Sequence, residues 1–286
     1  MNARQSSSLV PTSRVAAFFD LDKTIIATSS AFAFGREFLN NGLITPTEAL
    51  QLSLAKASYM VVGQTSQQMD TTRDQLTEMI KGWSVSDVQE IATETMNSVV
   101  TPAIYSEARE LIKYHKAAGH AVVIISASAA PLVELIAKEL GVEDVVATEL
   151  EVVDGKFTGE ILNYCKGPEK AKAMQRIAAE QGINLDASFA YSDSATDIPM
   201  LQLVGNPVAV NPDRGLRKHA VDNKWDIRAF KNPVPLFTMP GAKEVGIGAS
   251  VVAGIAACVA GAVWLLQQPE VLKQLGLSHP PRSRRR

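Results

Sequence analysis

Two aspartates directly follow a short apolar run near the start of the chain. Residues 15–24 read V-A-A-F-F-D-L-D-K-T, so Asp20 and Asp22 stand two positions apart, and Thr24 two positions further on. Alternate residues of an extended chain point to the same side, so we expect both carboxylates to project from the end of a buried strand. When two carboxylates lie this close, their repulsion raises the pKa of one of them unless a shared proton or a bound cation offsets the charge. Mg²⁺ is a suitable cation because it prefers oxygen ligands and keeps waters that a reaction can use.

Four further polar residues stand after apolar runs or where helices begin. Ser126 follows the run A-V-V-I-I, Lys170 opens a helical stretch after Gly167, and Asp193 and Asp197 follow the run S-F-A-Y. Phosphoryl transfer needs in-line positioning and neutralisation of the charge on the phosphoryl oxygens. A carboxylate can attack phosphorus and divide one difficult step into two. The stretches together indicate a site for phosphate chemistry, whereas the first stretch alone is equally compatible with solvated acids in a turn.

The acids have distinct expected roles. Asp20 is the expected nucleophile, because the strand end holds it most rigidly, and Asp22 is the expected general acid and base. Asp193, with Asp20 and the backbone carbonyl of Asp22, is expected to bind Mg²⁺. Asp197 is expected to orient the waters of the ion, and a plain N-cap of the helix that follows it is the alternative.

The remaining site residues are expected to contact the phosphoryl group. Ser126 would donate a hydrogen bond, with the backbone amide of Ala127 beside it. Lys170 would place a positive charge on the phosphoryl oxygens. Lys166 and Lys172 compete for that role. Thr24, from the first stretch, would fix the turn or touch the phosphate.

The elements that must position these residues follow an alternating pattern from residue 103 onward. Strands are predicted at 121–125, 145–147, 188–191 and 207–210, a hairpin around Asp154-Gly155, and helices at 104–118, 131–140 and 170–181. Alternating strands and helices are typical of a parallel sheet with helices on both faces. Ligands of such sheets bind beyond the carboxyl ends of the strands, so Asp20, Ser126 and Asp193 are expected at one edge.

The stretch between the first strand and this alternating part has helical spacing and no clear strand signal. We therefore predict a helical insert there. The predicted organisation is a disordered lead at 1–13, a catalytic core at 14–28 and 103–236, a helical cap at 29–102, a linker at 237–244, a transmembrane helix at 245–267 and a basic tail at 268–286.

The order and spacing of these motifs resemble the haloacid dehalogenase superfamily of phosphatases. The position of the helical insert is similar to that of C1-capped members, and S-D-S-A-T-D-I-P-M-L resembles the phosphoserine-phosphatase-like branch, subfamily IB. The resemblance covers about residues 13–236. It implies a Rossmann-like parallel sheet, Mg²⁺, and the same roles for Asp20 and Asp22. The family pattern of a glycine three residues before the lysine favours Lys170. Thr196 stands where close relatives often carry Asn and is expected among the substrate-binding residues.

One departure from that branch concerns the substrate. In phosphoserine phosphatases a cap glutamate nine residues after the nucleophile meets the amino group of the substrate. In this chain that position is Ser29, followed by Ser30. Because no carboxylate is available there, phosphoserine is a less favoured substrate.

Composition narrows the class of protein. The 286-residue chain has a formal net charge of −2, so no overall basic field predicts nucleic-acid binding. Its two cysteines form no C-x-x-C pair, which favours a reducing compartment over a zinc site or a disulfide framework. The polar N-terminus lacks the apolar region of a secretory signal.

The C-terminal part contains an uncharged run. Residues 245–267 contain no Asp, Glu, Lys or Arg, and as a helix they could cross about 30 Å of hydrocarbon. Trp264 suits an interfacial anchor. We predict a single-pass protein of the cell membrane with its catalytic domain in the cytoplasm. An Ala/Gly-rich buried helix, or a helix on the bilayer surface with the arginines of the tail on anionic lipid, are the alternatives.

The leading hypothesis is a membrane-anchored, Mg²⁺-dependent phosphatase acting through an aspartyl-phosphate. Its expected partner is a phosphorylated small molecule, lipid or phosphoprotein. One rival hypothesis is a phosphatase of soluble metabolites, for which the anchor determines only the location of the protein and not its substrate. The other is a regulatory membrane protein that binds a phosphorylated partner without significant turnover.

Overall fold

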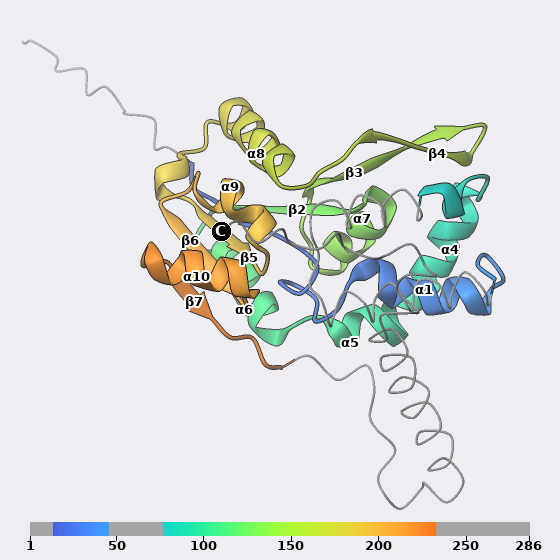
Figure 1. Cartoon of the computed structure of the whole chain (residues 1–286), viewed down its shortest axis with the longest axis horizontal. Coiled ribbons are helices and arrows are strands. Elements are labelled where there is room, and N and C mark those ends of the chain that lie inside the picture. Colours follow the sequence, from blue (N-terminus) through green and yellow to red (C-terminus); the bar gives the residue numbers. More distant parts are fainter. Residues whose placement is uncertain (1–13, 46–76, 233–286) are drawn as a thin grey trace, which may run out of the picture. The chain divides into compact units, whose positions relative to one another are not determined.

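The computed structural model describes residues 14–45 and 77–232 (Figure 1). Within these ranges no helix has the length and apolar character required to cross a membrane. The predicted lead, linker, transmembrane helix and basic tail lie outside the described residues, as does the middle of the predicted cap.

A seven-stranded sheet forms the centre of the described structure, with strand order β4-β3-β2-β1-β5-β6-β7. Neighbouring strands are parallel except β3 and β4, which pair antiparallel. The strands are β1 (Ala16–Phe19), β2 (Ala121–Ala129), β3 (Asp144–Val153), β4 (Lys156–Asn163), β5 (Phe189–Ser192), β6 (Asn206–Val210) and β7 (Asp226–Arg228). The predicted α/β fold with a mainly parallel sheet is confirmed.

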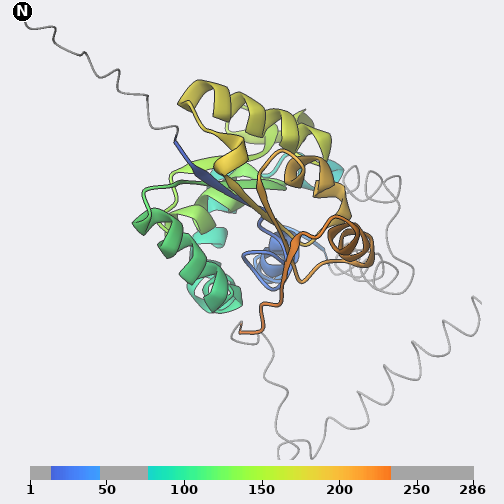
Figure 2. The same ribbon diagram turned by 90° about the vertical axis from the view of Figure 1, so that its left-hand side faces the viewer.

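Helices cover both faces of this sheet. Apolar residues of α6 (Ser106–Ala117) and α7 (Ala130–Glu139) belong to the hydrophobic cluster on one face. Residues of α8 (Pro168–Gln181), α9 (Ile198–Leu201) and α10 (Arg214–Asp222) belong to the cluster on the other. Figure 2 shows α8 and α10 across the sheet from α6. The site residues at the strand ends therefore rest on two packed layers.

Strand β1 explains why the first motif is so apolar. Ala17 and Phe19 pack into one cluster, Ala16 and Phe18 pack into the other, and all four side chains are fully buried. A central parallel strand covered by helices on both sides needs apolar residues at every position. Asp20 follows immediately, at the first position beyond the strand.

Two strands extend further than the sequence pattern predicts. β2 continues through Ser126 to Ala129, and β3 is one continuous strand where a short strand and a separate hairpin arm were expected. Register shifts in both pairings allow β3 to leave its parallel partner β2 and continue as the antiparallel partner of β4. The hairpin turn at Asp154-Gly155 is where it was predicted.

The described parts of the predicted cap are helical. They include α1 (Ser30–Asn40), α4 (Val85–Thr95), a π-helical turn (Met96–Val100) and the short α5 (Thr101–Ala103), and residues 77–80 are helical as well. The start of α4 is hydrogen-bonded to the tip of the β3–β4 hairpin. The backbone N–H groups of Gly82 and Val85 donate to the carbonyls of Phe157 and Gly155 at 2.7 and 3.0 Å. The amide of Phe157 donates to the carbonyl of Trp83 at 3.0 Å.

Candidate active site

The ends of β1, β2 and β5 meet at one edge of the sheet. Phe19 of β1 pairs in register with Ile124 of β2 and with Tyr191 of β5. The amide of Asp20 donates to the carbonyl of Tyr191 at 2.9 Å, which fixes the backbone of Asp20 at the edge. Asp193 stands two residues beyond Tyr191. Asp20 and Asp193 therefore lie at the same edge of the sheet, as predicted.

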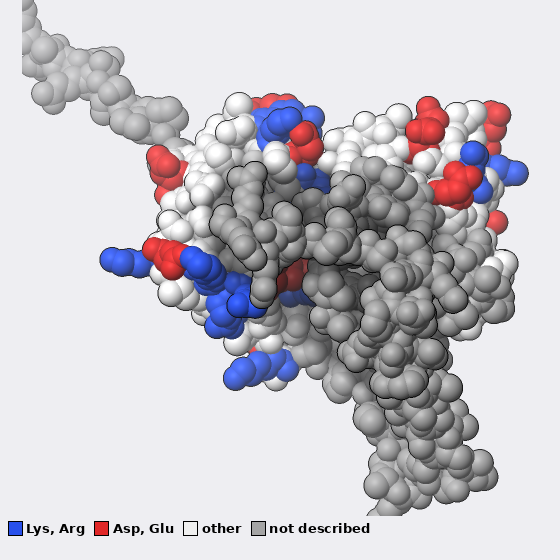
Figure 3. All heavy atoms as spheres, viewed as in Figure 1, with Lys and Arg blue, Asp and Glu red and all other residues white. Residues whose placement is uncertain are grey.

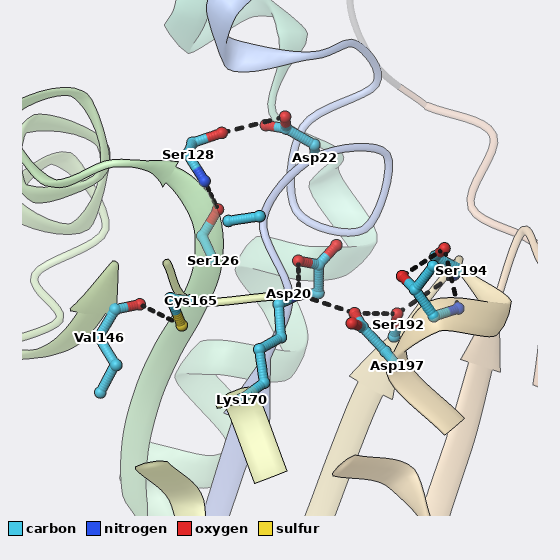
Figure 4. A network of polar contacts seen from close by, with 12 residues as sticks. Asp20, Asp22, Ser126, Ser128, Val146, Cys165, Lys170, Ser192, Ser194 and Asp197 are labelled. Carbon is cyan, nitrogen blue, oxygen red and sulfur yellow. Dashed lines mark hydrogen bonds and ion pairs between the residues drawn. The ribbon is translucent and has the colours of Figure 1, made fainter. Parts of the chain in front are cut away.

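Lys170 lies between two aspartates. Its Nζ is 2.6 Å from Oδ1 of Asp20 and 2.7 Å from Oδ2 of Asp197, and the lysine side chain is only 3% exposed (Figure 4). It is the lysine that the glycine spacing favours. The competing lysines are engaged elsewhere, because Lys172 forms an exposed pair with Glu169 and Lys166 lies over the ring of Tyr164.

A glycine sets the start of the helix that carries this lysine. Gly167, directly before α8, has φ 55° and ψ −120°. Residues with a Cβ rarely adopt this conformation. The chain turns here from the end of β4 into α8, and Lys170 follows within the first helical turn. Gly167 therefore determines where the ammonium group is placed.

Burial and like charge dominate the electrostatics of the carboxylates. Burial raises the pKa of Asp20 to about 7, against the lowering effect of Lys170. Burial and the neighbouring Asp20 raise the pKa of Asp193 to about 8. Burial alone would lower the pKa of Lys170, but attraction to Asp197 and Asp20 raises it well above its ordinary value, so the lysine stays charged.

Asp197 serves as a buried anchor. Its Oδ2 accepts hydrogen bonds from Lys170 and, at 2.8 Å, from the hydroxyl of Ser192, and the residue is 2% exposed. Asp197 precedes α9 without a side-chain capping hydrogen bond, so the plain N-cap alternative does not describe its contacts. Its expected role toward a metal stays a prediction.

Asp22 has a different set of partners from Asp20. Its Oδ1 accepts from the amide of Ser30 at 2.9 Å, and its Oδ2 accepts from the hydroxyl of Ser128 at 3.2 Å. Figure 4 shows this carboxylate turned toward Ser128, while Asp20 faces Lys170. The two acids were expected to point together, but β1 ends at Phe19, so the alternation of a strand does not extend to Asp22.

The other predicted contact residues lie around these acids. Ser126 is 1% exposed and its hydroxyl oxygen accepts from the amide of Ser128 at 3.1 Å, which leaves its own O–H available to donate. The carbonyl of Ala127 accepts from Thr148. The hydroxyl of Thr196 lies 3.0 Å from that of Ser194. Thr24 is fully buried, and its Oγ1 has no hydrogen-bond partner within the part of the chain that the structure describes.

The donor set fits a hard cation such as Mg²⁺. Three carboxylates, those of Asp20, Asp193 and Asp197, are buried, and the ammonium group of Lys170 contacts two of them, Asp20 and Asp197. Burial first, and then the repulsion between neighbouring carboxylates, raise the pKa values of Asp20 and Asp193. Among the described residues, no three or more His, Cys, Asp or Glu side chains are arranged so that they could enclose a metal ion by themselves. Mg²⁺ needs no such cage, because one or two carboxylates with waters and phosphate oxygens suffice.

The comparison with known families agrees with this geometry. The family described as haloacid dehalogenase-like hydrolase matches residues 17–202, which includes every strand-end residue of the site. The chain belongs to the haloacid dehalogenase-like hydrolases. It is therefore a member of a hydrolase family, and the predicted superfamily is confirmed.

Two curated relatives are similar along most of the chain. Probable phosphatase Rv3661 of Mycobacterium tuberculosis is 45% identical over 254 residues, covering 88% of each chain. The inhibition of morphological differentiation protein of Streptomyces azureus is 45% identical over 258 residues, covering 88% of this chain and 92% of its own. A solved phosphoserine phosphatase structure, a phospho-aspartyl intermediate analogue, aligns with a TM-score of 0.56 at 22% identity. That alignment covers 77% of this chain and 95% of the other and shows that the two proteins share a fold.

Three serines of the site were not predicted as functional residues. Ser128 and Ser30 bind Asp22, and Ser192 binds Asp197. A signal existed for Ser128, because it follows Ser126 by two positions in the motif S-A-S and so shares its face in an extended strand. No local signal links Ser30 or Ser192 to its carboxylate.

Proposed function

We propose that this haloacid dehalogenase-like hydrolase is a phosphatase that cleaves a phosphomonoester through an aspartyl-phosphate on Asp20. The observation that carries the proposal is the buried Asp20–Lys170 contact of 2.6 Å at the carboxyl edge of the sheet. A carboxylate held beside a fixed positive charge is suited to attack phosphorus while the charge on the phosphoryl oxygens is neutralised. The name of the relative Rv3661, a probable phosphatase, supports the same activity.

The described contacts suggest how the bonds are exchanged. Lys170 holds Oδ1 of Asp20, which leaves Oδ2 for the attack on phosphorus. As the new O–P bond forms, the bond to the ester oxygen breaks, and that oxygen keeps the electron pair and takes a proton from Asp22. A water then loses a proton to Asp22 and attacks the aspartyl-phosphate, which releases phosphate and restores both acids. Burial raises the pKa of Asp22 against the hydrogen bonds it accepts, which favours a group that must carry a proton.

Mg²⁺ is part of this proposal. Asp20, Asp193 and the backbone carbonyl of Asp22 would hold the ion, with Asp197 near its waters. The bound ion would supply further neutralisation of the phosphoryl oxygens. Ser126, with the amide of Ala127, would donate to the same oxygens. Thr24, close to the nucleophile in sequence, has a buried hydroxyl that finds no partner among the described residues.

The substrate proposal follows from the position nine residues after Asp20. Ser29 stands there, and its side chain contributes a hydrogen bond to Asp22. It therefore offers no carboxylate to an ammonium group. We favour a phosphorylated small molecule, lipid or phosphoprotein whose recognition does not need an amino group at that place, and phosphoserine remains less favoured.

Activity toward a generic ester tests the enzymatic proposal. Wild type should release phosphate steadily from p-nitrophenyl phosphate with Mg²⁺ present, and Asp20→Asn should lose about a thousandfold or more in kcat. Asp186→Asn, a matched change at an exposed aspartate, should keep full activity. Acid-quenched wild type incubated with labelled substrate should carry label on Asp20. Equal turnover by wild type and Asp20→Asn would contradict the proposal and leave the regulatory binding protein as the better hypothesis.

We also propose that the run at 245–267 anchors the protein in the cell membrane, with the catalytic domain in the cytoplasm. The support is the uncharged 23-residue length and the flanking basic residues of the sequence. Removal of residues 242–286, followed by cell fractionation, tests this. The full chain should pellet with membranes and resist carbonate extraction, whereas the truncated chain should be soluble. A truncated chain that still pellets would contradict the anchor.

A further inference from the structure

A chain of two serine hydroxyls leads to the carboxylate of Asp22. The hydroxyl of Ser30 donates to that of Ser128 at 2.6 Å, and Ser128 donates to Oδ2 of Asp22 at 3.2 Å. The amide of Ser30 donates to Oδ1 at 2.9 Å. Both oxygens of Asp22 therefore have a partner, and the hydroxyl of Ser128 accepts from Ser30 and donates to Asp22. Figure 4 shows the bond between Ser128 and Asp22.

We propose that Ser128 and Ser30 are positioning residues that hold Asp22 in place as the proton donor to the leaving group. This proposal rests on the proposed phosphatase function and deepens it.

The two serines come from separate parts of the chain. Ser128 lies near the end of β2, in the motif that also carries Ser126, and Ser30 is the first residue of α1. Residues 98 positions apart are thus joined by one short hydrogen bond beside the acid. Ser30 is fully buried, and its side chain acts on Asp22 as well as on Ser128, so both serines hold the same carboxylate.

The two serines of the motif S-A-S, Ser126 and Ser128, have different hydrogen-bonding roles. The amide of Ser128 donates to the hydroxyl oxygen of Ser126 at 3.1 Å. Because Ser126 accepts this bond, its own O–H remains able to donate to another group. Ser126 is thus available for the phosphoryl group of the proposed reaction, while the hydroxyl of Ser128 binds Asp22.

The chemical consequence depends on the leaving group. Breaking the ester bond places negative charge on the leaving oxygen, and a poorly stabilised alkoxide needs the proton of Asp22 more than a nitrophenolate does. A displaced Asp22 therefore slows the cleavage of alkyl phosphates strongly and that of p-nitrophenyl phosphate weakly. A serine that only stabilised the fold would affect both substrates equally.

The test uses the full-length protein with Mg²⁺ and compares kcat/KM for p-nitrophenyl phosphate and an alkyl phosphate. This constant covers the steps up to departure of the leaving group. Ser128→Ala should lower it less than about threefold for the aryl ester and by about tenfold or more for the alkyl ester. Ser30→Ala should show the same trend, and Ser128→Thr, which keeps the hydroxyl, should restore alkyl-ester cleavage.

Ser188→Ala is the matched control. Ser188 is a buried serine with two hydrogen bonds, to the amide of Ala16 and the carbonyl of Asn184, and it immediately precedes β5 at the end opposite to Asp193. It should lower stability without changing the ratio between the two substrates. In an Asp22→Asn background, Ser128→Ala should have no further effect on that ratio.

Two outcomes would overturn the inference. The first is an equal loss for both substrates in Ser128→Ala, and the second is no loss for either. Both are distinct from failure of the proposed function, because in that case Asp20→Asn would retain the activity of wild type.

Discussion

Lys170 and Asp197 form a buried ion pair, with Nζ and Oδ2 separated by 2.7 Å and both side chains at most 3% exposed. The same ammonium group also contacts Asp20. The lysine therefore has two functions that are difficult to separate. It neutralises buried acids, and it is the fixed charge that the proposed reaction uses.

Removal of this lysine should affect stability and activity together. Lys170→Ala leaves Asp197 and Asp20 buried without their cation, so we expect the free energy of unfolding to fall by about 3–5 kcal/mol and turnover to be lost. Urea unfolding and p-nitrophenyl phosphate hydrolysis measure the two effects. Lys172→Ala, at the exposed pair with Glu169, should change stability by less than about 1 kcal/mol. A Lys170→Ala protein as active as wild type would show that the charge is dispensable.

Binding of Mg²⁺ should be measurable without activity. A ligand that binds only the folded state stabilises it, so millimolar Mg²⁺ should raise the Tm of wild type. Asp193→Asn removes one proposed ligand and should abolish the rise, whereas Asp186→Asn should keep it. Chelation with EDTA should remove turnover, and added Mg²⁺ should restore it. The metal assignment is wrong if Asp193→Asn retains the full Mg²⁺-dependent rise in Tm.

Any residue with a Cβ should be unfavourable at position 167, because of the backbone conformation there rather than because of a steric clash. A Cβ there would meet the carbonyl oxygen of Thr196 at an ordinary 3.5 Å, but φ 55° with ψ −120° is unfavourable for alanine. Gly167→Ala should lower stability by about 1–3 kcal/mol and reduce kcat/KM, because Lys170 moves with the helix start. Gly182→Ala, in the ordinary left-handed region at the other end of α8, should lower stability by about 1 kcal/mol and leave kcat/KM unchanged. Equal kcat/KM in both variants would count against this positioning role.

Stability should decrease in mild acid because of His115. This buried histidine contacts the hydroxyl of Tyr191 through Nε2 at 2.8 Å and Nδ1 of His120 at 2.9 Å. Burial first, then the charges of His120 and Arg228, lower the pKa of His115 to about 4.

The sign of the effect follows from proton uptake. Between pH 6.5 and pH 4 the unfolded chain binds a proton at this site and the folded chain does not, so stability is complete above pH 6.5 and falls as the pH decreases. The loss from this residue should approach about 3 kcal/mol at the acid end. His115→Gln should flatten the decrease in urea-unfolding free energy over that range, and His219→Gln should not. A decrease that is as steep in His115→Gln as in wild type would refute this assignment.

The fold and the central acids could be predicted because they depend on local pattern. A strand covered on both faces must be apolar throughout, so the runs before Asp20, Ser126 and Asp193 identified three strands, and the topology of a parallel sheet placed their ends together. The family pattern of a glycine three residues before the lysine distinguished Lys170 from its neighbours. Basic and acidic side chains both occur among the described residues on the face in Figure 3, with Lys and Arg gathered near α10.

What could not be predicted depends on contacts between distant residues. Asp22 and Ser128 are 106 positions apart, and no periodicity relates them. The orientation of Asp22 was missed for a related reason, because β1 ends before it and the turn at Lys23 has a positive φ of 61°. The edge strand β7 (Asp226–Arg228) escaped prediction because only its central residue is partly buried, which gives almost no hydrophobic signal.

The backbone bonds that join Gly82, Trp83 and Val85 to the hairpin have a mechanical consequence. Two covalent connections lead from the helical segment into the sheet, and these bonds add a third, noncovalent attachment at the turn between β3 and β4. A hinge motion of α4 away from the sheet must either break that attachment or bend the hairpin along with it. The position of α4 is thereby coupled to the stiffness of a two-stranded arm that carries none of the proposed reacting groups.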